Sequence, residues 1–384
     1  MRRLLLAPLL FLGIGLGIGL IGVVREADQP PSPLTVCPQG PPACDFAQIQ
    51  QAIDAAPPGA TIEIGAGTYA ENLSIVDKPL TLRGQGGNAI IQGVLPTVAV
   101  VQIRVAQPSP VILEEIAVIA PLADPGSFGP DGVVISGSTQ AVLRRVQVSR
   151  VDSSGLVIQD VANATIEESQ FFHSGDGIVV EGRSRVTIRR VLAFGNGVGI
   201  SISGSAQAQL EEVRVLANSA AGIFIDGPRA QVLIQDSDIA GNGFGGPSPG
   251  VSIFGAADVQ ILQTAIYGNH GYGLSILDDP SNAIKVEVSR SFIFSNRFSG
   301  IFAHLGNPDT HVELTENEIY ANLDRYGVEV ETPPCVSRPT TVRGTISGRK
   351  NVIPRPEEGA ANRLGAVCPD ALSFLMTDQG GSYP

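Results

Sequence analysis

The sequence predicts an all-β solenoid, in which short strands stack in successive coils around one apolar core. Three observations predict it: a recurring glycine, alternating aliphatic residues after that glycine, and an asparagine before most repeats. A period of this kind describes units that bury their apolar side chains on their neighbours. Two-residue alternation excludes a helical repeat. By subtraction the glycines are 22 to 28 residues apart, at Gly132, Gly155, Gly177, Gly199, Gly222, Gly250, Gly273, Gly300 and Gly327.

The asparagines occupy one position of the repeat and are explained by the fold. Asparagine tolerates left-handed turn geometry, and stacked amides bond one coil to the next. We therefore predict that these side chains form an internal ladder and bind no ligand. They are Asn196, Asn218, Asn242, Asn269, Asn296 and Asn322.

A second strand is expected in each coil before the asparagine turn, and it ends in a pair of charged residues. The sign of the pair alternates from coil to coil: Arg144 and Arg145, Glu167 and Glu168, Arg189 and Arg190, Glu211 and Glu212. Because coils stack about 4.8 Å apart, these residues would form columns of alternating sign. We interpret them as structural ion pairs in preference to a polyanion-binding patch.

Composition limits the classes of partner. The chain has 384 residues, with 45 Gly, 28 Pro, no Trp and 16% charged residues, which suits tight turns and stacked aliphatic rungs. A continuous repeat favours one elongated domain over two or three globular ones. The net charge of −12 argues against nucleic acid as a partner, and against unaided binding of acidic polysaccharides.

Residues 1–28 are predicted to be a signal-anchor or a signal peptide. Arg2 and Arg3 precede an uncharged apolar run from Leu4 to Val24, which is long enough to cross a bilayer. The segment that follows is a poor cleavage site, so we favour an uncleaved membrane anchor. Either alternative places the rest of the chain outside the cytoplasm, membrane-anchored or secreted. Residues 29–44 are predicted to be a Pro-rich linker.

The four cysteines fall into two groups that flank the repeat. An even count in an exported protein predicts two disulfides, which would pin the two ends of the solenoid. The pairs expected are Cys37 with Cys44 and Cys335 with Cys368.

The start of the repeat carries a family resemblance. Phe46, Ile49 and Ile53 have helical spacing, with Asp45 as an N-cap, and this helix is placed to cover the first coil. The stretch from Ile49 to Ile62, followed by Gly67-Thr68-Tyr69, Lys78-Pro79-Leu80 and Leu82-Arg83-Gly84, resembles the opening of pectin-lyase-like proteins. These include the NosD-like and the carbohydrate-binding and sugar-hydrolase groups.

The resemblance implies a right-handed parallel β-helix over residues 45–353, followed by a C-terminal cap and tail over 354–384. It identifies the fold better than the activity, because one fold hosts many activities. Polygalacturonases of this fold carry acidic and histidine motifs just before successive strands. The matching positions here hold Asp131 and Asp176, whereas a paired Asp-Asp, a Gly-His-Gly and an Arg-Ile-Lys are missing. These two residues are the catalytic candidates, and the alternative is that both are turn residues.

The sequence favours no metal or cofactor. The histidines are too scattered for a metal motif, and no dense acidic cluster beside a lone arginine, as in pectate lyases, is present. The inserted loops of the longer coils contain Asp278, Asp279 and Asp309, whose oxygens are ligands that Ca²⁺ accepts. Solvated loop residues are the alternative.

A modest binding surface is expected on the outward positions of the glycine-initiated strands. Its predicted members are Phe224, Phe254, Phe302, His304, Glu181 and Asp226. We therefore predict an extracytoplasmic β-helix protein that binds a polysaccharide or a partner protein at the cell surface. The alternatives are a polysaccharide-cleaving hydrolase or lyase and a passive structural or adhesin spike.

Overall fold

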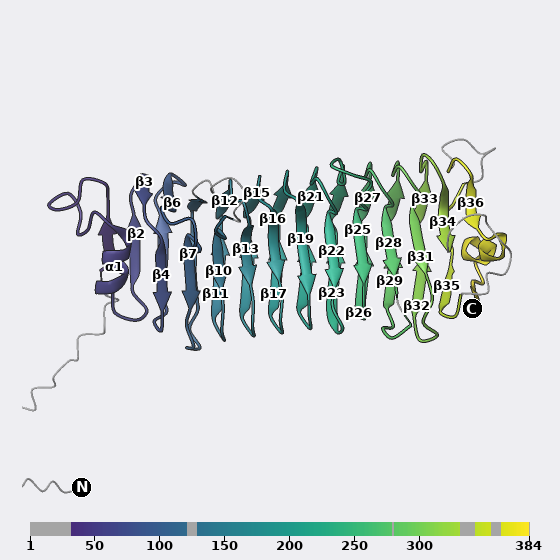
Figure 1. The fold of residues 1–384 in the computed structure, drawn as a ribbon, viewed down its shortest axis with the longest axis horizontal. Coiled ribbons are helices and arrows are strands. Elements are labelled where there is room, and N and C mark those ends of the chain that lie inside the picture. Colours follow the sequence, from purple (N-terminus) through teal and green to yellow (C-terminus); the bar gives the residue numbers. More distant parts are fainter. Residues whose placement is uncertain (1–31, 121–128, 279, 331–341, 355–361, 384) are drawn as a thin grey trace, which may run out of the picture. The chain divides into compact units, whose positions relative to one another are not determined.

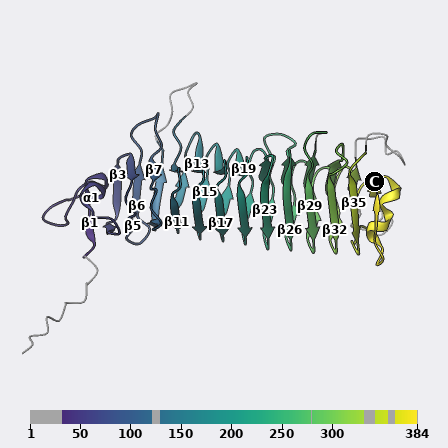
Figure 2. The same cartoon turned by 90° about the horizontal axis from the view of Figure 1, so that it is seen from below.

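The computed structural model describes residues 32–120, 129–278, 280–330, 342–354 and 362–383. Their strands form three sheets, and each sheet takes its strands in chain order, one from each successive coil (Figure 1). Seen from below, the labelled strands again follow one another in chain order (Figure 2). Every pairing between named strands is parallel except that of β35 with β37, which is antiparallel. The predicted all-β parallel solenoid is confirmed.

The strands of each sheet have the following bounds. The 14-stranded sheet contains β1 (Leu34–Val36), β2 (Thr61–Ile64), β5 (Thr81–Gly84), β8 (Val111–Glu114), β11 (Gln140–Arg144), β14 (Asn163–Glu167), β17 (Arg185–Arg189), β20 (Gln207–Glu211), β23 (Ala230–Gln235), β26 (Ala257–Leu262), β29 (Lys285–Ser289), β32 (His311–Thr315), β35 (Thr345–Arg349) and β37 (Gly381–Tyr383). The 12-stranded sheet contains β4 (Leu73–Val76), β7 (Val101–Arg104), β10 (Val133–Ile135), β13 (Ser154–Ile158), β16 (Asp176–Val180), β19 (Val198–Ser203), β22 (Ile223–Asp226), β25 (Val251–Phe254), β28 (Leu274–Leu277), β31 (Ile301–His304), β34 (Tyr326–Val330) and β36 (Gly365–Cys368). The 11-stranded sheet contains β3 (Gly67–Ala70), β6 (Ala89–Gln92), β9 (Ile116–Ile119), β12 (Gln147–Ser149), β15 (Gln170–Phe172), β18 (Leu192–Phe194), β21 (Arg214–Leu216), β24 (Asp238–Ala240), β27 (Ala265–Tyr267), β30 (Phe292–Phe294) and β33 (Glu318–Tyr320).

Each full coil therefore has three strands, whereas the sequence pattern predicted two. The glycine-initiated strands make up most of the 12-stranded sheet, and the strands that end in charged pairs lie in the 14-stranded sheet. The strands of the 11-stranded sheet are mostly three residues long, as in β12, where only Val148 is buried. One inward residue leaves no alternation to detect, which is why this strand was missed.

The core consists of aliphatic side chains at the inward positions of all three sheets. In β17, Val186 and Ile188 are buried, whereas Arg185 and Thr187 face outward. The register keeps like residues in columns, with Ile166, Ile188 and Leu210 on consecutive strands. Each coil therefore gains its apolar burial from its neighbours, as a solenoid requires.

The predicted asparagine ladder is confirmed. Asn218 donates from its side-chain amide to Oδ1 of Asn242 at 2.8 Å, and Asn242 donates to Asn269 at 3.0 Å. The same amides also bond backbone groups, as Asn242 does to the Val215 carbonyl at 3.0 Å. All of these side chains are buried. They are structural residues, and the ladder extends beyond Asn322 to Asn362 at 2.7 Å.

The predicted charge columns are also confirmed. Arg144 contacts Glu167 at 3.2 Å, and Arg189 contacts Glu211 at 2.7 Å. The column starts earlier than expected, because Arg83 contacts both Glu63 and Glu114. The backbone is left-handed at the corner after the 14-stranded sheet, with φ of 52° at Arg145, 51° at Glu168 and 51° at Arg190. There too Arg190 contacts Glu168 at 3.1 Å.

The N-terminal helix α1 (Ile49–Ala55) is present but starts later than predicted. Its N-cap residue is Gln48, and the Glu71 carboxylate accepts the first backbone N–H groups, from Ile49 at 2.8 Å and Gln50 at 2.9 Å. The prediction of Asp45 as N-cap was wrong, because its carboxylate accepts the backbone N–H and hydroxyl of Thr35. Helix α1 contacts β1, β2 and β4 (Figure 1).

The two ends of the described repeat differ from the expected boundaries. Within the segment predicted as a linker, β1 pairs in parallel with β2, and Val36 is buried. Residues after 353 include β36, which continues the 12-stranded sheet, and the 3-10 helix η2 (Asp370–Met376), which contacts β35, β36 and β37. The short alternation from Leu34 to Val36 was the only sequence signal that the β-helix begins before residue 45.

The disulfide between Cys37 and Cys44 is confirmed, with Cα atoms 6.0 Å apart. Cys368 is buried and is not a free thiol, whereas Cys335 lies outside the described residues, so this second pair stays a prediction. The predicted membrane segment within residues 1–28 also lies outside them. Within the described part of the chain, no helix is both long enough and apolar enough to cross a membrane.

Candidate glycan-binding groove

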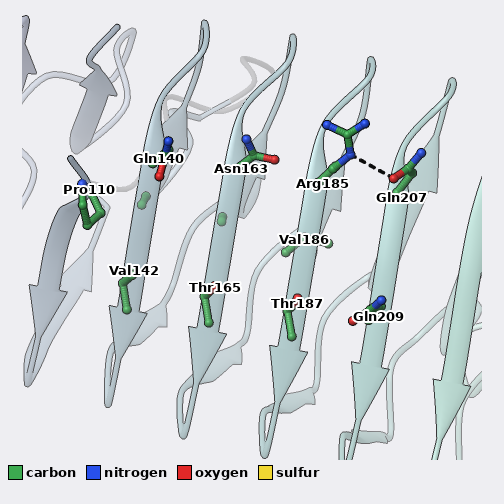
Figure 3. Close-up of a pocket in the computed structure, with 12 residues that line it drawn as sticks. Pro110, Gln140, Val142, Asn163, Thr165, Arg185, Val186, Thr187, Gln207 and Gln209 are labelled. Carbon is green, nitrogen blue, oxygen red and sulfur yellow. Dashed lines mark hydrogen bonds between the residues drawn. The ribbon is translucent and has the colours of Figure 1, made fainter. Parts of the chain in front are cut away.

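A shallow hollow of about 350 Å³ lies on the outward face of the 14-stranded sheet, across β11, β14, β17 and β20 (Figure 3). Alternation along these strands produces it. In β11, Ala141 and Leu143 point into the core, which leaves Gln140 and Val142 on the outer face. We call this surface the outer groove; its lining residues are Pro110, Gln140, Ala141, Val142, Asn163, Ala164, Thr165, Arg185, Val186, Thr187, Gln207 and Gln209.

The parallel register arranges the outward side chains of the outer groove in two columns. Gln140, Asn163, Arg185 and Gln207 lie on consecutive strands in one column, and Val142, Thr165, Thr187 and Gln209 lie in the other. Figure 3 shows both columns side by side, with the guanidinium of Arg185 directed to Gln207. The Arg185 Nε donates to Gln207 Oε1 at 2.9 Å.

Polar side chains continue along the outer face of the 14-stranded sheet toward the C-terminus. A second hollow of about 340 Å³ shares Gln207 and Gln209 with the outer groove and extends across β23 and β26. It adds Gln231, Leu233, Asp258 and Gln260. A polar track therefore crosses consecutive coils, and a ligand that repeats along its length would meet similar groups at each step.

The chemistry of the outer groove is that of hydrogen bonding. Its amides and hydroxyls each donate and accept, which matches the dual character of sugar hydroxyl groups. None of the residues that line the first hollow is a carboxylate. Glycoside hydrolysis uses two carboxylates that face one substrate. The outer groove is therefore equipped to bind a polyhydroxylated chain and has no acid and base pair of its own.

The catalytic candidates lie on another part of the coil: Asp131 shortly precedes β10, and Asp176 is the first residue of β16, both at the start of the 12-stranded sheet. Asp131 Oδ1 accepts the backbone N–H of Ser154 at 3.0 Å, and Asp176 Oδ1 accepts that of Val198 at 3.3 Å. Ser154 pairs with Asp176, so each carboxylate bonds to the equivalent position of the next coil. Burial raises the pKa of Asp176, and its bond to Val198 opposes that shift. These bonds cross to the next coil and do not close a local turn, so the choice between catalytic and turn residues stays a prediction.

The predicted binding residues lie on the 12-stranded sheet and do not gather in one place. Phe224 and Phe302 occupy one outward column but are separated by Ser252 and Ser275. Phe302 is only 7% exposed, because the ring of Tyr272 stacks on it with centroids 4.8 Å apart. The expectation that Phe302 is an exposed stacking surface was therefore wrong.

The remaining members occupy the neighbouring column of that face, except Glu181, which follows β16. Asp226 pairs in register with Phe254, which is 43% exposed, and Leu277 separates Phe254 from His304. Glu181 is half-buried, and its backbone N–H bonds to Ile158. The predicted members other than Glu181 therefore lie along the 12-stranded sheet, spread over several strands and two columns.

The carboxylate of Asp278 is hydrogen-bonded within the protein. Its side chain is fully buried; one oxygen accepts the Gly306 N–H at 2.6 Å and lies 3.1 Å from Nδ1 of His304, and the other accepts the Asn307 N–H at 2.9 Å. Asp309 lines a separate hollow with Lys285 and Arg229. Asp279 lies outside the described residues. Among the described residues, no three His, Cys, Asp or Glu side chains are grouped in a way that would hold a metal ion.

The outer groove itself was missed from the sequence. Its strands were recognised by their aliphatic residues and terminal charges, and the amides between them carried no motif. One signal was available: the position before each inward alanine or valine holds Gln140, Asn163, Arg185 and Gln207 in successive repeats. A polar column of this kind becomes visible only once the repeats are aligned.

Comparisons with known proteins agree with the geometry. A model of the right handed beta helix region matches residues 131–287. The chain folds as a right-handed parallel β-helix. A search of curated protein sequences finds no match to this β-helix.

Several solved structures share the fold. The A-module of the Azotobacter vinelandii mannuronan C-5 epimerase AlgE4 is similar with a TM-score of 0.57 and 19% identity, over 74% of this chain and 93% of that one. The catalytic domain of a GH87 alpha-1,3-glucanase, solved with nigerose, has a TM-score of 0.60 and 13% identity, over 92% and 68%. Tailspike protein 2 of Escherichia coli O157:H7 bacteriophage CAB120 has a TM-score of 0.52 and 14% identity, over 69% and 40%. At these identities the likeness shows the fold.

Proposed function

We propose that this β-helix binds a glycan chain along the outer groove, at the cell surface or outside the cell. The observation that carries the proposal is the pair of outward columns across β11, β14, β17 and β20, which present amides and hydroxyls at successive coils. A chain of sugars repeats along its length, as the groove does. A predominantly uncharged glycan fits best, because the protein has a net charge of −12 and the first hollow contains one charged residue.

Binding is favoured over cleavage and over a protein partner. Oδ1 of Asp131 and Oδ1 of Asp176 each accept a backbone N–H of the next coil, which supports a structural role for both residues. The outer groove offers no large exposed aromatic side chain of the kind that dominates protein interfaces. Three of the solved structures with this fold are a glucanase, a mannuronan epimerase and a tailspike. Their shared fold supports a glycan ligand by analogy.

We infer that the segment within residues 1–28 anchors the chain in a membrane or directs its export, and that helix α1 covers the first coil. Ile49, Ala52 and Ile53 of α1 are buried, which supports a covering role. An open end of a solenoid would expose apolar rungs and unpaired strand edges.

A glycan array combined with a reducing-sugar release assay tests the proposed function. We expect binding to one class of largely neutral glycan, with no release of reducing ends from the glycan that binds. Release of reducing ends would favour the polysaccharide-cleaving alternative. Absence of binding across the array would favour the passive spike.

A further inference from the structure

The partner of Arg185 differs from the partners of the arginines at the other end of these strands. Arg144, Arg189 and Arg190 each lie within 3.2 Å of a glutamate oxygen. Arg185 forms no ion pair among the described residues, and its Nε donates to the neutral Gln207 amide at 2.9 Å. Figure 3 shows the guanidinium at the start of β17, where Nε bonds to Gln207 and the two terminal nitrogens bond to none of the residues drawn.

The register explains why Arg185 has no carboxylate beside it. Its neighbours on the adjacent strands are Asn163 and Gln207, whereas the neighbours of Arg189, four residues along β17, are Glu167 and Glu211. The next acidic residue in the Arg185 column is Asp258, three strands away. At the usual strand spacing that is about 14 Å, beyond the screening length of about 10 Å at moderate ionic strength.

We propose that Arg185 recognises an isolated anionic substituent, a carboxylate or a group of similar charge, on the glycan that occupies the outer groove. This inference rests on the proposed function and adds the class of ligand. A guanidinium presents paired N–H groups in a fork that matches a carboxylate, and Asn163 and Gln207 supply further hydrogen bonds beside it.

A densely charged polyanion fits the outer groove poorly. It would place a charge at every sugar, whereas this surface holds one cation across the four strands of the first hollow. The remaining charges would face neutral amides on a protein whose net charge is −12. The ligand class is therefore a largely neutral glycan that carries occasional acidic groups.

The test uses two matched probes, a neutral glucan and the same glucan with a fraction of its primary hydroxyls oxidised to carboxylates. Binding of each is measured at low ionic strength for the wild type, for Arg185→Gln and for Arg183→Gln. Arg183 is an exposed arginine in the turn before β17 that does not line the outer groove, so it controls for the loss of one positive charge.

We expect the wild type to prefer the oxidised glucan on the order of fivefold, since exposed charge pairs are individually weak. Arg185→Gln should remove the preference, Arg183→Gln should retain it, and added salt should reduce it. Equal binding of both probes by the wild type, or a preference that survives in Arg185→Gln, would overturn the role of Arg185 and leave the glycan-binding groove standing. Failure of the wild type to bind either probe would contradict both proposals.

Discussion

Asn218 and Asn242 bond to each other twice across one coil. The side-chain amide of Asn218 donates to Asn242 Oδ1 at 2.8 Å, and the backbone N–H of Asn218 donates to the same oxygen at 3.1 Å. Both side chains are fully buried. One carbonyl oxygen therefore satisfies two buried N–H groups. Removing it would leave the backbone N–H of Asn218 without a partner, whereas the side-chain amide would keep its bond to the Ala193 carbonyl at 3.3 Å.

We predict that Asn242→Ala destabilises the middle coils by about 3 kcal/mol, since each unsatisfied buried polar group costs about 1–3 kcal/mol. Urea unfolding followed by circular dichroism measures the effect. Gln170→Ala, an exposed amide on β15, is the control and should change the free energy of unfolding by less than about 0.5 kcal/mol. Equal effects of the two substitutions would show that the ladder contributes nothing specific.

Reversing Arg189 and Arg190 to Glu should destabilise the protein by about 1–2 kcal/mol at low salt. The change would place three anionic rungs in succession at both columns, where Arg189 now contacts Glu211 and Arg190 contacts Glu168. The arginine side chains are 42% and 44% exposed, so screening keeps the effect modest. The melting midpoint should recover partly in high salt. An unchanged midpoint at low salt would contradict the importance of the column.

Replacing Cys37 and Cys44 by Ser should cost about 2 kcal/mol in the chain-entropy account, because their disulfide closes a short loop. Thermal unfolding with and without reductant measures this, and the double variant should no longer respond to reductant through this pair. Peptide mapping of the unreduced protein should also find Cys335 joined to Cys368. Labelling of all four thiols in the native protein would refute both pairs.

The stability of the fold should depend on pH through Asp176. Burial raises the pKa of this carboxyl in the folded state above its ordinary value of 3.8, so the folded protein holds the proton more tightly than the unfolded chain. Stability is therefore lost as pH rises from about 4 through the folded pKa. Asp176→Asn keeps an acceptor for the Val198 N–H and removes the charge.

This variant should melt at a higher temperature than the wild type near neutral pH, and the two should converge in acid. The same variant tests catalysis. If the wild type cleaves a glycan and Asp176→Asn retains that activity, Asp176 is not the catalytic acid. Loss of the activity by orders of magnitude, without a change in melting temperature, would contradict our account and support the catalytic role.

The features that repeat were predictable from the sequence, and those that depend on neighbouring coils were not. Asn218 and Arg189 recur at fixed positions, so their stacking follows from the period alone. The third strand was missed because β12 and its equivalents bury a single residue each. Phe302 was placed on the correct face, but its cover by Tyr272 comes from the preceding coil. The outer groove escaped notice because Gln140 and Asn163 belong to no motif and acquire meaning only in register.

The central claim is that the outer face of the 14-stranded sheet binds the glycan. Two double variants of the same two coils test it most directly by isothermal titration with the best glycan from the array. Gln140→Ala with Asn163→Ala removes adjacent amides from the outer groove, and Gln147→Ala with Gln170→Ala removes adjacent amides from the 11-stranded sheet. At about 1 kcal/mol per lost hydrogen bond, we predict that the first pair weakens binding by about tenfold or more and that the second leaves it unchanged. Equal affinity of the two double variants, or a loss confined to the 11-stranded sheet, would contradict the account.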